Sequence, residues 1–353
     1  MSNPDMVRRA TVKVSFAGTD ITSYILSNFS SFTYTDNEED ETDDLQIKLQ
    51  DRDGQWACDW LSDAVQAAAA TSLRIDARIV RQNWFGDGKD DVLHCGSFEL
   101  DSIDYSGPPA VVTIKATSLP FSAQIRQTLK TKAWEAYPLS GIVKEMSAAN
   151  GMTCMFLSGS DPYYERVEQY KTSDISFLST LCHDAGLSLK ATNKALVVFD
   201  QADYESKPSV LTIRKGDSTY TKYRLNMGTA DAQYQSCRVS YVNPANGKCI
   251  SGTAYIEDYT DSKNNQQLEV TAKVSSEAEA KALAQKRLRL HNKFEKTISF
   301  TLPGNPALVA GVTFALSGWG PWDGKYIIKQ AIHSLGSSGY TVQIKGRRVL
   351  EGY

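Results

Sequence analysis

The sequence predicts a mainly β protein with an α+β insert: two related antiparallel β-barrel domains and one small α/β module. Three observations lead to this fold class. Apolar and polar residues alternate with period two in the first and last thirds of the chain, as in antiparallel strands with one buried face. The middle third instead spaces its apolar residues as amphipathic helices do. Finally, one β-rich segment of the first third recurs in the last third.

Length and composition are those of a folded protein with two or three domains. The chain has 353 residues, of which 41% are hydrophobic and 22% charged, and this excludes a largely disordered chain. The formal net charge of −3 argues against nucleic-acid binding as the main function, because phosphate binding requires clustered Lys and Arg. No stretch approaches the roughly 20 apolar residues of a membrane-spanning helix. Residues 1–14 lack the apolar core of a signal peptide, so we expect folding in the cytoplasm.

We assign residues 1–125 to a first β-barrel domain. Its strands are predicted by the alternating segments TVKVSFAG, SFTYTD, LQIKLQD, LRIDARIV, GSFELDSIDYS and AVVTIKATS. The acidic run DNEEDETDD, at residues 36–44, is interpreted as a solvated hairpin tip that self-repulsion keeps exposed. The run lacks the glycine and the spacing of an EF-hand calcium loop. A short helical piece is predicted at residues 56–70.

Residues 126–205 form a predicted inserted α/β module of two helices and a β-hairpin. The first helix lies in WEAYPLSGIVKEMSAANG and ends at Gly151. The second lies in TSDISFLSTLCHDAG, is capped by one of residues 172–174 and ends at Gly186. The hairpin follows in LSLKATNKALVVFD, with its turn at residues 192–193.

Residues 206–353 are predicted to form a second β-barrel domain with one amphipathic helix. The helix lies in SEAEAKALAQKRLRLH, where Ser276 and Glu279 fit a capping box. The segments QYQSCRVSYV and KCISGTAYIED indicate a hairpin across the turn NPANG. Further strands are predicted in SVLTIRKG, KTISFTL, ALVAGVTFAL, GKYIIKQAIHS and YTVQIKGR.

The two β-barrel domains are predicted to be related because one hairpin occurs in both. The segment from Gly96 to Lys115 can be laid on the segment from Gly324 to Lys345. Each has a glycine, an aromatic residue, an aliphatic residue and a serine in the same order, and each closes on Val-x-Ile-Lys. The only offset lies in the hairpin loop, where insertion has little effect on stability. Alternation alone does not require the glycine, the aromatic residue or the lysine, so we interpret the pair as an internal duplication.

The residue types of catalytic and metal sites occur without the spacing of a known site. No CxxC pair, GxSxG elbow or Walker loop is present, and no two histidines have the spacing of paired metal ligands. We interpret the cysteines as small buried hydrophobes, although Cys237 and Cys249 flank the predicted hairpin turn and could form a disulfide. The histidines are interpreted as structural. We therefore predict no catalytic residue, no metal ligand and no cofactor. The residues concerned are Cys58, Cys95, Cys154, Cys182, Cys237, Cys249, His94, His183, His291 and His333.

In their order and spacing, these segments resemble the tail hub proteins of phages and phage-like contractile injection machines, the late-control D family. The likeness begins with F-x-Y-x-D-N-E-E-x-E-x-D-D-L-x-I-x-L-x-D at residues 32–51, followed by Trp56 and Trp60. It continues through residues 96–109 and residues 176–190. It ends in SEAEAKALA, PGNPALVAG, DGKYII and GYTV. These are packing and turn patterns, and their shared order along nearly the whole chain carries the resemblance.

The resemblance implies a homotrimeric structural hub, not an enzyme, in the baseplate of a virion tail or injection particle assembled in the bacterial cytoplasm. Its implied partners are a central spike protein, the tail tube or tube-initiator protein and other baseplate proteins, with no specific nucleic acid. Three copies with two similar barrels each would present six near-equivalent units to a six-fold tube and keep the three-fold symmetry of the spike. The chain ends directly after the second repeat, so we expect a separate spike protein.

Two other functions stay open from the residues alone. Trp319 and Trp322, in SGWGPWDGKY, occupy a turn and could form a sugar-stacking platform, which would make the protein a carbohydrate-binding tail or surface adhesin. A cell-wall hydrolase associated with a tail is the other alternative, but among 41 acidic residues no carboxylate pair stands out.

Overall fold

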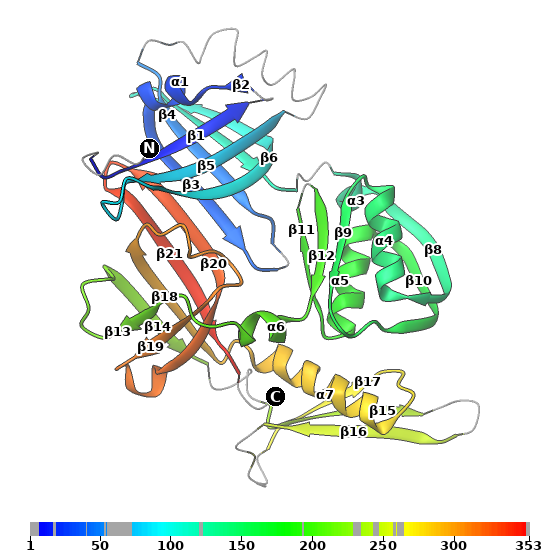
Figure 1. Ribbon diagram of the computed structural model, residues 1–353. Coiled ribbons are helices and arrows are strands. Elements are labelled where there is room, and N and C mark those ends of the chain that lie inside the picture. Colours follow the sequence, from blue (N-terminus) through cyan, green and yellow to red (C-terminus); the bar gives the residue numbers. More distant parts are fainter. Residues whose placement is uncertain are drawn as a thin grey trace.

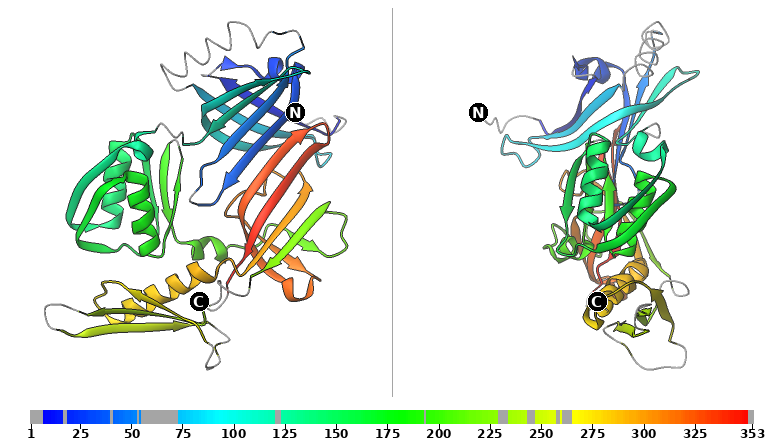
Figure 2. Two further views of the ribbon diagram at one scale, coloured as in Figure 1. Left: turned by 180° about the vertical axis from the view of Figure 1, so that it is seen from behind. Right: turned by 90° about the vertical axis from the view of Figure 1, so that its right-hand side faces the viewer.

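The protein consists of two β-units and two α/β modules (Figure 1). The predicted fold class, mainly β with antiparallel sheets and an α/β insert, is confirmed. Both modules lie on the same side of the β-units, as the view from behind in Figure 2 shows. None of the described helices is long and apolar enough to span a bilayer. The computed structural model describes residues 7–16, 19–39, 41–52, 54, 73–119, 123–192, 194–228, 234–242, 247–256, 259 and 265–350.

The first β-unit is built from the alternating segments of the first third. In β4, for example, Leu45, Ile47 and Leu49 face the core while the residues between them face away. The predicted helical piece at residues 56–70 lies outside the described residues. The elements of this unit are β1 (Arg9–Phe16), β2 (Thr19–Asp20), α1 (Thr22–Ser27), β3 (Phe29–Asn37), β4 (Asp44–Gln50), β5 (Arg74–Gln82), β6 (Asp90–Ser106) and β7 (Val111–Thr117).

The second β-unit repeats this pattern around its own core. Ile298, Phe300 and Leu302 of β18 are buried in the way that the three apolar residues of β4 are. The elements of this unit are β13 (Thr212–Arg214), β14 (Lys222–Met227), β18 (Lys296–Pro303), β19 (Thr313–Ser317), the 3-10 turn η1 (Gly320–Trp322), β20 (Gly324–Gly336) and β21 (Gly339–Arg348).

The two β-units share one hydrogen-bonded sheet. Its strands follow the order β14-β18-β21-β20-β3-β4-β7-β6-β5-β1-β2. The junction is antiparallel pairing of β20 with β3, in which Ala331 lies opposite Asp36 and His333 opposite Tyr34. The first half of β20 pairs instead with β19, so this long strand serves both units. A shared ladder fixes the two units to each other through backbone hydrogen bonds.

The repeat predicted from the sequence is present in the strand pairing. Ile103 lies opposite Ile114 in the hairpin β6–β7, and Ala331 lies opposite Ile344 in the hairpin β20–β21. These are the positions that the sequence repeat places in register. The two aligned segments therefore form hairpins with equivalent strand pairing.

The structure extends the repeat to five strands. The order β3-β4-β7-β6-β5 in the first unit matches β14-β18-β21-β20-β19 in the second, and every pair is antiparallel. A β-bulge follows Leu100 in β6 and Ile328 in β20, the residues that the repeat equates. Bulges bend a strand at a defined point, so the two units share a local distortion as well as a topology.

The inserted module contains the two predicted helices and the predicted hairpin β11–β12, and three more strands. The segment from Trp134 to Pro138, predicted to begin the first helix, instead ends strand β8, because the helix starts only after the proline. Ser173 caps the second helix by accepting a hydrogen bond from the Ser176 backbone N–H. The elements are α3 (Gln124–Gln127), β8 (Leu129–Pro138), α4 (Leu139–Ala149), β9 (Thr153–Leu157), β10 (Tyr163–Ser173), α5 (Asp174–Asp184), β11 (Ser188–Ala191), β12 (Ala195–Phe199) and α6 (Gln201–Ser206).

A second α/β module interrupts the second β-unit, which corrects the prediction of one barrel over residues 206–353. The predicted hairpin forms as β15 (Ser236–Val242) and β16 (Cys249–Tyr255), but it joins β17 (Gln267–Thr271) in a separate sheet. Helix α7 (Glu277–Asn292) packs on this sheet, because its alanine and leucine stripe requires an apolar face of its own. Ser276 caps the helix as predicted by accepting from the Glu279 N–H, whose carboxylate accepts in turn from the N–H of Ser275.

Candidate interdomain site

The acidic segment, residues 36–44, is mostly buried, so the predicted solvated hairpin tip is wrong. The side chains of Asp36, Glu38, Glu39 and Asp43 lie in residues that are only 4% to 7% exposed. Cations from three other elements surround them, at sequence separations of 154 to 309 residues. These cations neutralise the carboxylates. The acidic segment can therefore be buried, and repulsion between its own residues does not keep it in solvent.

Lys190 of β11 joins the inserted module to the first β-unit. Its Nζ lies 2.9 Å from Asp36 Oδ1 and 3.2 Å from Asp43 Oδ1, and it donates a 2.6 Å hydrogen bond to the Asn37 carbonyl oxygen. Burial raises the pKa of Asp43 to about 6, although Lys190 acts in the opposite direction. Burial alone would lower the pKa of Lys190, but the two carboxylates outweigh it and raise that pKa.

Arg347, near the end of β21, is at the centre of an ion-pair cluster. It donates hydrogen bonds to Glu205 of α6, to Glu38 of the acidic segment at 3.4 Å and to the Gln201 side-chain oxygen at 3.1 Å. Glu205 also pairs with Arg289 of α7. A single buried guanidinium therefore connects both β-units with the inserted module, and its partner carboxylate extends the link to α7.

A second cation of α7 completes the cluster. Lys293, which follows the helix, lies 2.5 Å from Glu39. Burial opposes ionisation of Glu39, but Lys293 outweighs it and lowers the pKa of Glu39. Burial raises the pKa of Glu38, with Arg347 opposing. The formal charges of the cluster balance, since three carboxylates meet three cations: Glu38, Glu39, Glu205, Arg289, Lys293 and Arg347.

The β20–β3 junction contains a buried histidine. His333 Nε2 lies 3.0 Å from the Leu308 carbonyl oxygen and Nδ1 lies 2.8 Å from the Tyr340 hydroxyl oxygen. A neutral ring that donates from Nε2 and accepts at Nδ1 satisfies both partners. The ring stacks on Tyr34 of β3 with centroids 6.0 Å apart. Burial lowers the pKa of His333 to about 4, so the ring is neutral near pH 7.

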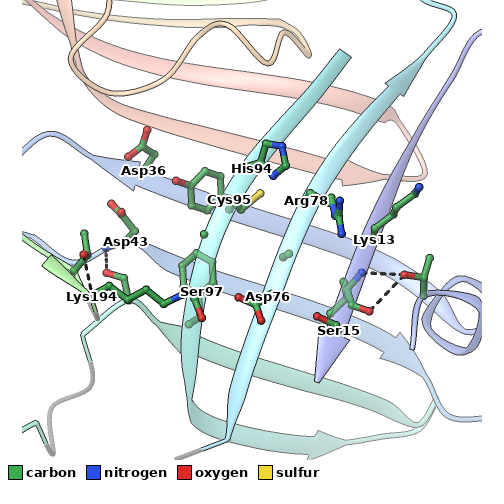
Figure 3. A pocket seen from close by; sticks show the side chains of 18 of the residues that line it. Lys13, Ser15, Asp36, Asp43, Asp76, Arg78, His94, Cys95, Ser97 and Lys194 are labelled. Atoms are coloured by element: carbon green, nitrogen blue, oxygen red, sulfur yellow. Dashed lines mark hydrogen bonds between the residues drawn. The ribbon is translucent and has the colours of Figure 1, made fainter. Parts of the chain in front are cut away.

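A pocket of about 820 Å³ opens between the first β-unit and the hairpin β11–β12 (Figure 3). Side chains of the neighbouring strands β1, β5 and β6 line it side by side, with Lys194 of the hairpin at one side. Both signs of charge are balanced in its lining, which favours interdomain contact over recognition of one charged ligand. Within the described residues no three His, Cys, Asp or Glu side chains form a group that could hold a metal ion. The charged lining residues are Lys13, Asp20, Asp36, Asp43, Asp76, Arg78, Lys190 and Lys194.

The described cysteines are mostly buried, as predicted, but Cys249 is exposed. Cys237 and Cys249 are free thiols, because the register of β15 and β16 places them at opposite ends of the hairpin. The alternative disulfide is therefore not formed. Cys95 lies in the core beside the pocket, and burial raises the pKa of its thiol. Cys58 lies outside the described residues.

The other histidines lie in three different elements. His94 is on β6 at the pocket, while His183 and His291 are in the last turns of α5 and α7. His183 Nδ1 is 2.9 Å from a nitrogen of the Arg287 guanidinium. The pKa of His291 is lowered mainly by burial.

The turn with two tryptophans does not present a stacking platform. Trp319 is 6% exposed, and its indole N–H donates a 3.1 Å hydrogen bond to the Ile213 carbonyl oxygen. Its ring packs against Tyr220 and Phe300 inside the second β-unit. Trp322 alone is partly exposed. The sugar-binding alternative requires two accessible rings and is not supported.

Comparison with known proteins identifies the family. Residues 113–339 match the model of the phage tail baseplate hub (GPD) family. The probable baseplate hub protein of Escherichia phage P2 is 32% identical over 172 residues, which cover 47% of this chain and 39% of that relative. The match thus spans about two-fifths of the curated relative.

Solved structures share the fold at low sequence identity. A tail protein from Neisseria meningitidis MC58 has a TM-score of 0.67 and 11% identity, with 96% of this chain and 97% of that chain covered. A component of the type VI secretion system of E. coli has a TM-score of 0.58 and 13% identity, with 97% and 78% covered. Because the family match spans more than half of the residues, the resemblance read from the sequence is confirmed, and the chain belongs to the phage tail baseplate hub (GPD) family.

Proposed function

We propose that this baseplate hub protein acts as a homotrimeric, non-catalytic adaptor between the six-fold tail tube and the three-fold central spike. The observation that carries the proposal is the five-strand duplication, with the same strand order, register and bulge in both β-units. Three copies would present six near-equivalent units to the tube, while true three-fold symmetry would remain for the spike.

The connection between the β-units supports the same role. An adaptor must hold its two units in a fixed relation, and here a backbone ladder between β20 and β3 is combined with a buried ion-pair cluster. The cluster also fixes α6 and α7, which carry the two modules. We propose residues 1–125 and 206–353 as the two hub domains, the latter interrupted by the second module, and residues 126–205 as the insert.

The partners of the adaptor are proposed as the central spike protein, the tube or tube-initiator protein and other baseplate proteins. The two α/β modules lie together on one side of the β-units (Figure 1), which suits contact with other baseplate proteins. The β-units would provide the surfaces for tube and spike.

Light scattering of the purified chain tests the oligomer. A trimer has three times the chain mass of 39.0 kDa, about 117 kDa. A strict monomer at high protein concentration contradicts the proposal. Imaging of the particle tests the position, since an adaptor must lie on the tail axis between tube and spike. Peptidoglycan zymography tests the absence of catalysis, and a lytic band from the purified chain contradicts it.

A further inference from the structure

The polar face of the second β-unit contains a trough that runs along β18. Strand β18 lies between β14 and β21 (Figure 1), and every second residue of these strands points away from the core. On β18 these residues have short hydroxyl side chains: Thr297, Ser299 and Thr301. The flanking strands carry longer side chains, so β18 forms a floor between two walls about 10 Å apart. The resulting pocket has a volume of about 540 Å³.

The walls carry cations that have no counter-charge in the described lining of the trough. Arg224 of β14 and Lys345 of β21 flank Ser299 in one row across the three strands. Among the described residues, neither side chain forms an ion pair or a hydrogen bond, and the same is true of Lys222. Only Arg347 belongs to the balanced ion-pair cluster. The pocket lining contains five cations and no carboxylate among its described residues: Lys222, Arg224, Lys329, Lys345 and Arg347.

Arg347 provides a buried donor at one end of the trough, beside Thr297. Its side chain is 1% exposed, and the two terminal nitrogens of its guanidinium pair with Glu205 and Glu38. Its Nε–H has no hydrogen-bond acceptor among the described residues. A buried donor without an acceptor is unfavourable, so an acceptor that enters the trough beside Arg347 would be stabilised there.

The first β-unit has the same three strands without this trough. Strands β3, β4 and β7 are equivalent to β14, β18 and β21, and the registers equate Thr33 with Arg224 and Gln46 with Ser299. The longer side chain therefore stands on the floor in the first unit, and the shorter one on the wall. A pocket of about 300 Å³ on this face is lined by one cation and two carboxylates: Lys115, Asp44 and Asp101. The duplicated fold thus does not require a cationic trough, which is specific to the second unit.

We propose that the trough binds an extended acidic segment of a partner protein, with carboxylates at alternate positions. The inference goes beyond the adaptor function and does not depend on it, because one chain contains the whole trough. Successive rows of the trough are about 7 Å apart, since they are two residues apart along the strands. An extended peptide has the same repeat, so its alternate side chains would meet successive rows. Three carboxylates would then meet Lys222, the pair Arg224 and Lys345, and the Nε–H of Arg347.

The lining favours a peptide over a nucleic-acid strand. Proteins bind single-stranded nucleic acids through bases that stack on aromatic rings. Tyr223 lines the pocket but lies on the opposite face of β14, where its ring packs against Trp319. Phe294 lies beside Lys329, whose Nζ is 4.8 Å from the ring centroid, and belongs to none of the three rows. The trough therefore offers charge and hydroxyl groups without a stacking platform.

Fluorescence anisotropy with the purified full chain tests the proposal. The probe is a labelled peptide with glutamate at every second position, and the control peptide has the same composition with its three glutamates consecutive. We expect one probe to bind per chain at low salt, about tenfold more tightly than the control peptide. Binding should weaken as the salt concentration rises. Equal binding of the two peptides, or no saturation at about 1 mM probe, overturns the proposal.

Substitution by the equivalent residue of the first β-unit gives variants that separate charge from shape. Arg224→Thr removes a cation of the wall, and Ser299→Gln fills the floor without a change of charge. Each should weaken probe binding about tenfold, with an unchanged circular dichroism spectrum. Lys345→Gln should also weaken binding, whereas Lys115→Gln removes the equivalent cation of the first unit and should bind as the wild type does. Equal losses in these two lysine variants would show general charge attraction and overturn the proposal.

Two further measurements identify other occupants. A labelled single-stranded oligonucleotide that binds more tightly than the probe, and that Arg224→Thr releases, would assign the trough to a phosphate backbone and overturn the peptide. A second copy occupies the trough if Arg224→Thr changes the oligomeric state in light scattering and leaves probe binding intact, which also overturns the proposal. Neither result affects the adaptor function, because particle imaging and the oligomeric state of the wild type test that function separately.

Discussion

Arg347 of β21 and Glu205 of α6 form an ion pair in which the side chains are only 1% and 2% exposed. The pair joins residues 142 positions apart and connects the second β-unit to the inserted module. A buried ion pair is weak proof of net stability, but removal of one partner leaves an uncompensated buried charge. The first prediction uses this asymmetry.

We predict that Arg347→Met lowers the free energy of unfolding by about 3–5 kcal/mol, because the Glu205 and Glu38 carboxylates lose a buried counter-charge. Urea unfolding followed by circular dichroism measures the effect. Arg166→Met is the matched control, since Arg166 is 61% exposed at the surface and should change stability by less than about 1 kcal/mol. Adding Glu205→Gln to Arg347→Met should recover part of the loss, and equal effects of the two single arginine variants would contradict the prediction.

We predict that His333 makes the protein less stable in mild acid. Its pKa is lowered by burial from 6.5 to about 4, so the unfolded chain binds a proton more readily than the folded chain between these values. The stability that the neutral His333 ring contributes is fully present above pH 6.5 and is lost as the pH falls toward 4. The expected size is about 3 kcal/mol at most. The measurement is urea unfolding of the wild type and His333→Gln from pH 4 to pH 8.

The comparison of the wild type with His333→Gln cancels the contributions of the other titrating groups, because both proteins contain them. Asp43 acts with the opposite sign, since burial raises its pKa from 3.8 to about 6 and the folded chain therefore loses stability as the pH rises between these values. That effect is common to both chains. The destabilisation by His333→Gln should therefore be largest above pH 6.5 and shrink toward pH 4. A difference that does not change with pH would contradict the assignment.

We predict that Gly252→Ala weakens the second α/β module. A Cβ at this position of β16 would lie 2.4 Å from the Lys281 backbone nitrogen of α7, so the helix would have to move away from the sheet. Overpacking of this kind lowers stability by about 1–3 kcal/mol. Hydrogen exchange of residues 277–292 should speed up. Gly159→Ala has open space around its Cβ and should leave the exchange unchanged.

We predict that replacing either of the two tryptophans of the second β-unit lowers the stability of the protein by a different amount, and that neither tryptophan binds glycans. Trp319→Ala should lower the free energy of unfolding by about 3–5 kcal/mol, since its ring is buried among aromatic side chains. Trp322→Ala should have a smaller effect, because that ring is partly exposed. Thermal unfolding measures both. Glycan-array binding by the wild type that Trp322→Ala abolishes would instead restore the adhesin alternative.

The sequence by itself determined the local structure and the duplication. Period-two alternation identified the strands, the candidate caps at residues 172–174 and at Ser276 identified helix starts, and the repeated hairpin occurs in both β-units. These features depend on residues within one element or one hairpin, so a local pattern records them. Order and spacing of the same segments were also sufficient for the family.

Only the tertiary structure decided what holds the parts together. The acidic segment looks solvated in the sequence because its own residues repel, whereas the cations that bury it come from β11, β21 and the end of α7. Nothing in the local pattern marks Lys190, Lys293 or Arg347 as partners. The pairing of β20 with β3 and the separation of the second α/β module likewise depend on contacts between segments that are distant in the sequence. Ion pairs and strand junctions between distant segments depend on which segments folding brings together. The period of the apolar residues, the helix caps and the composition do not contain that information.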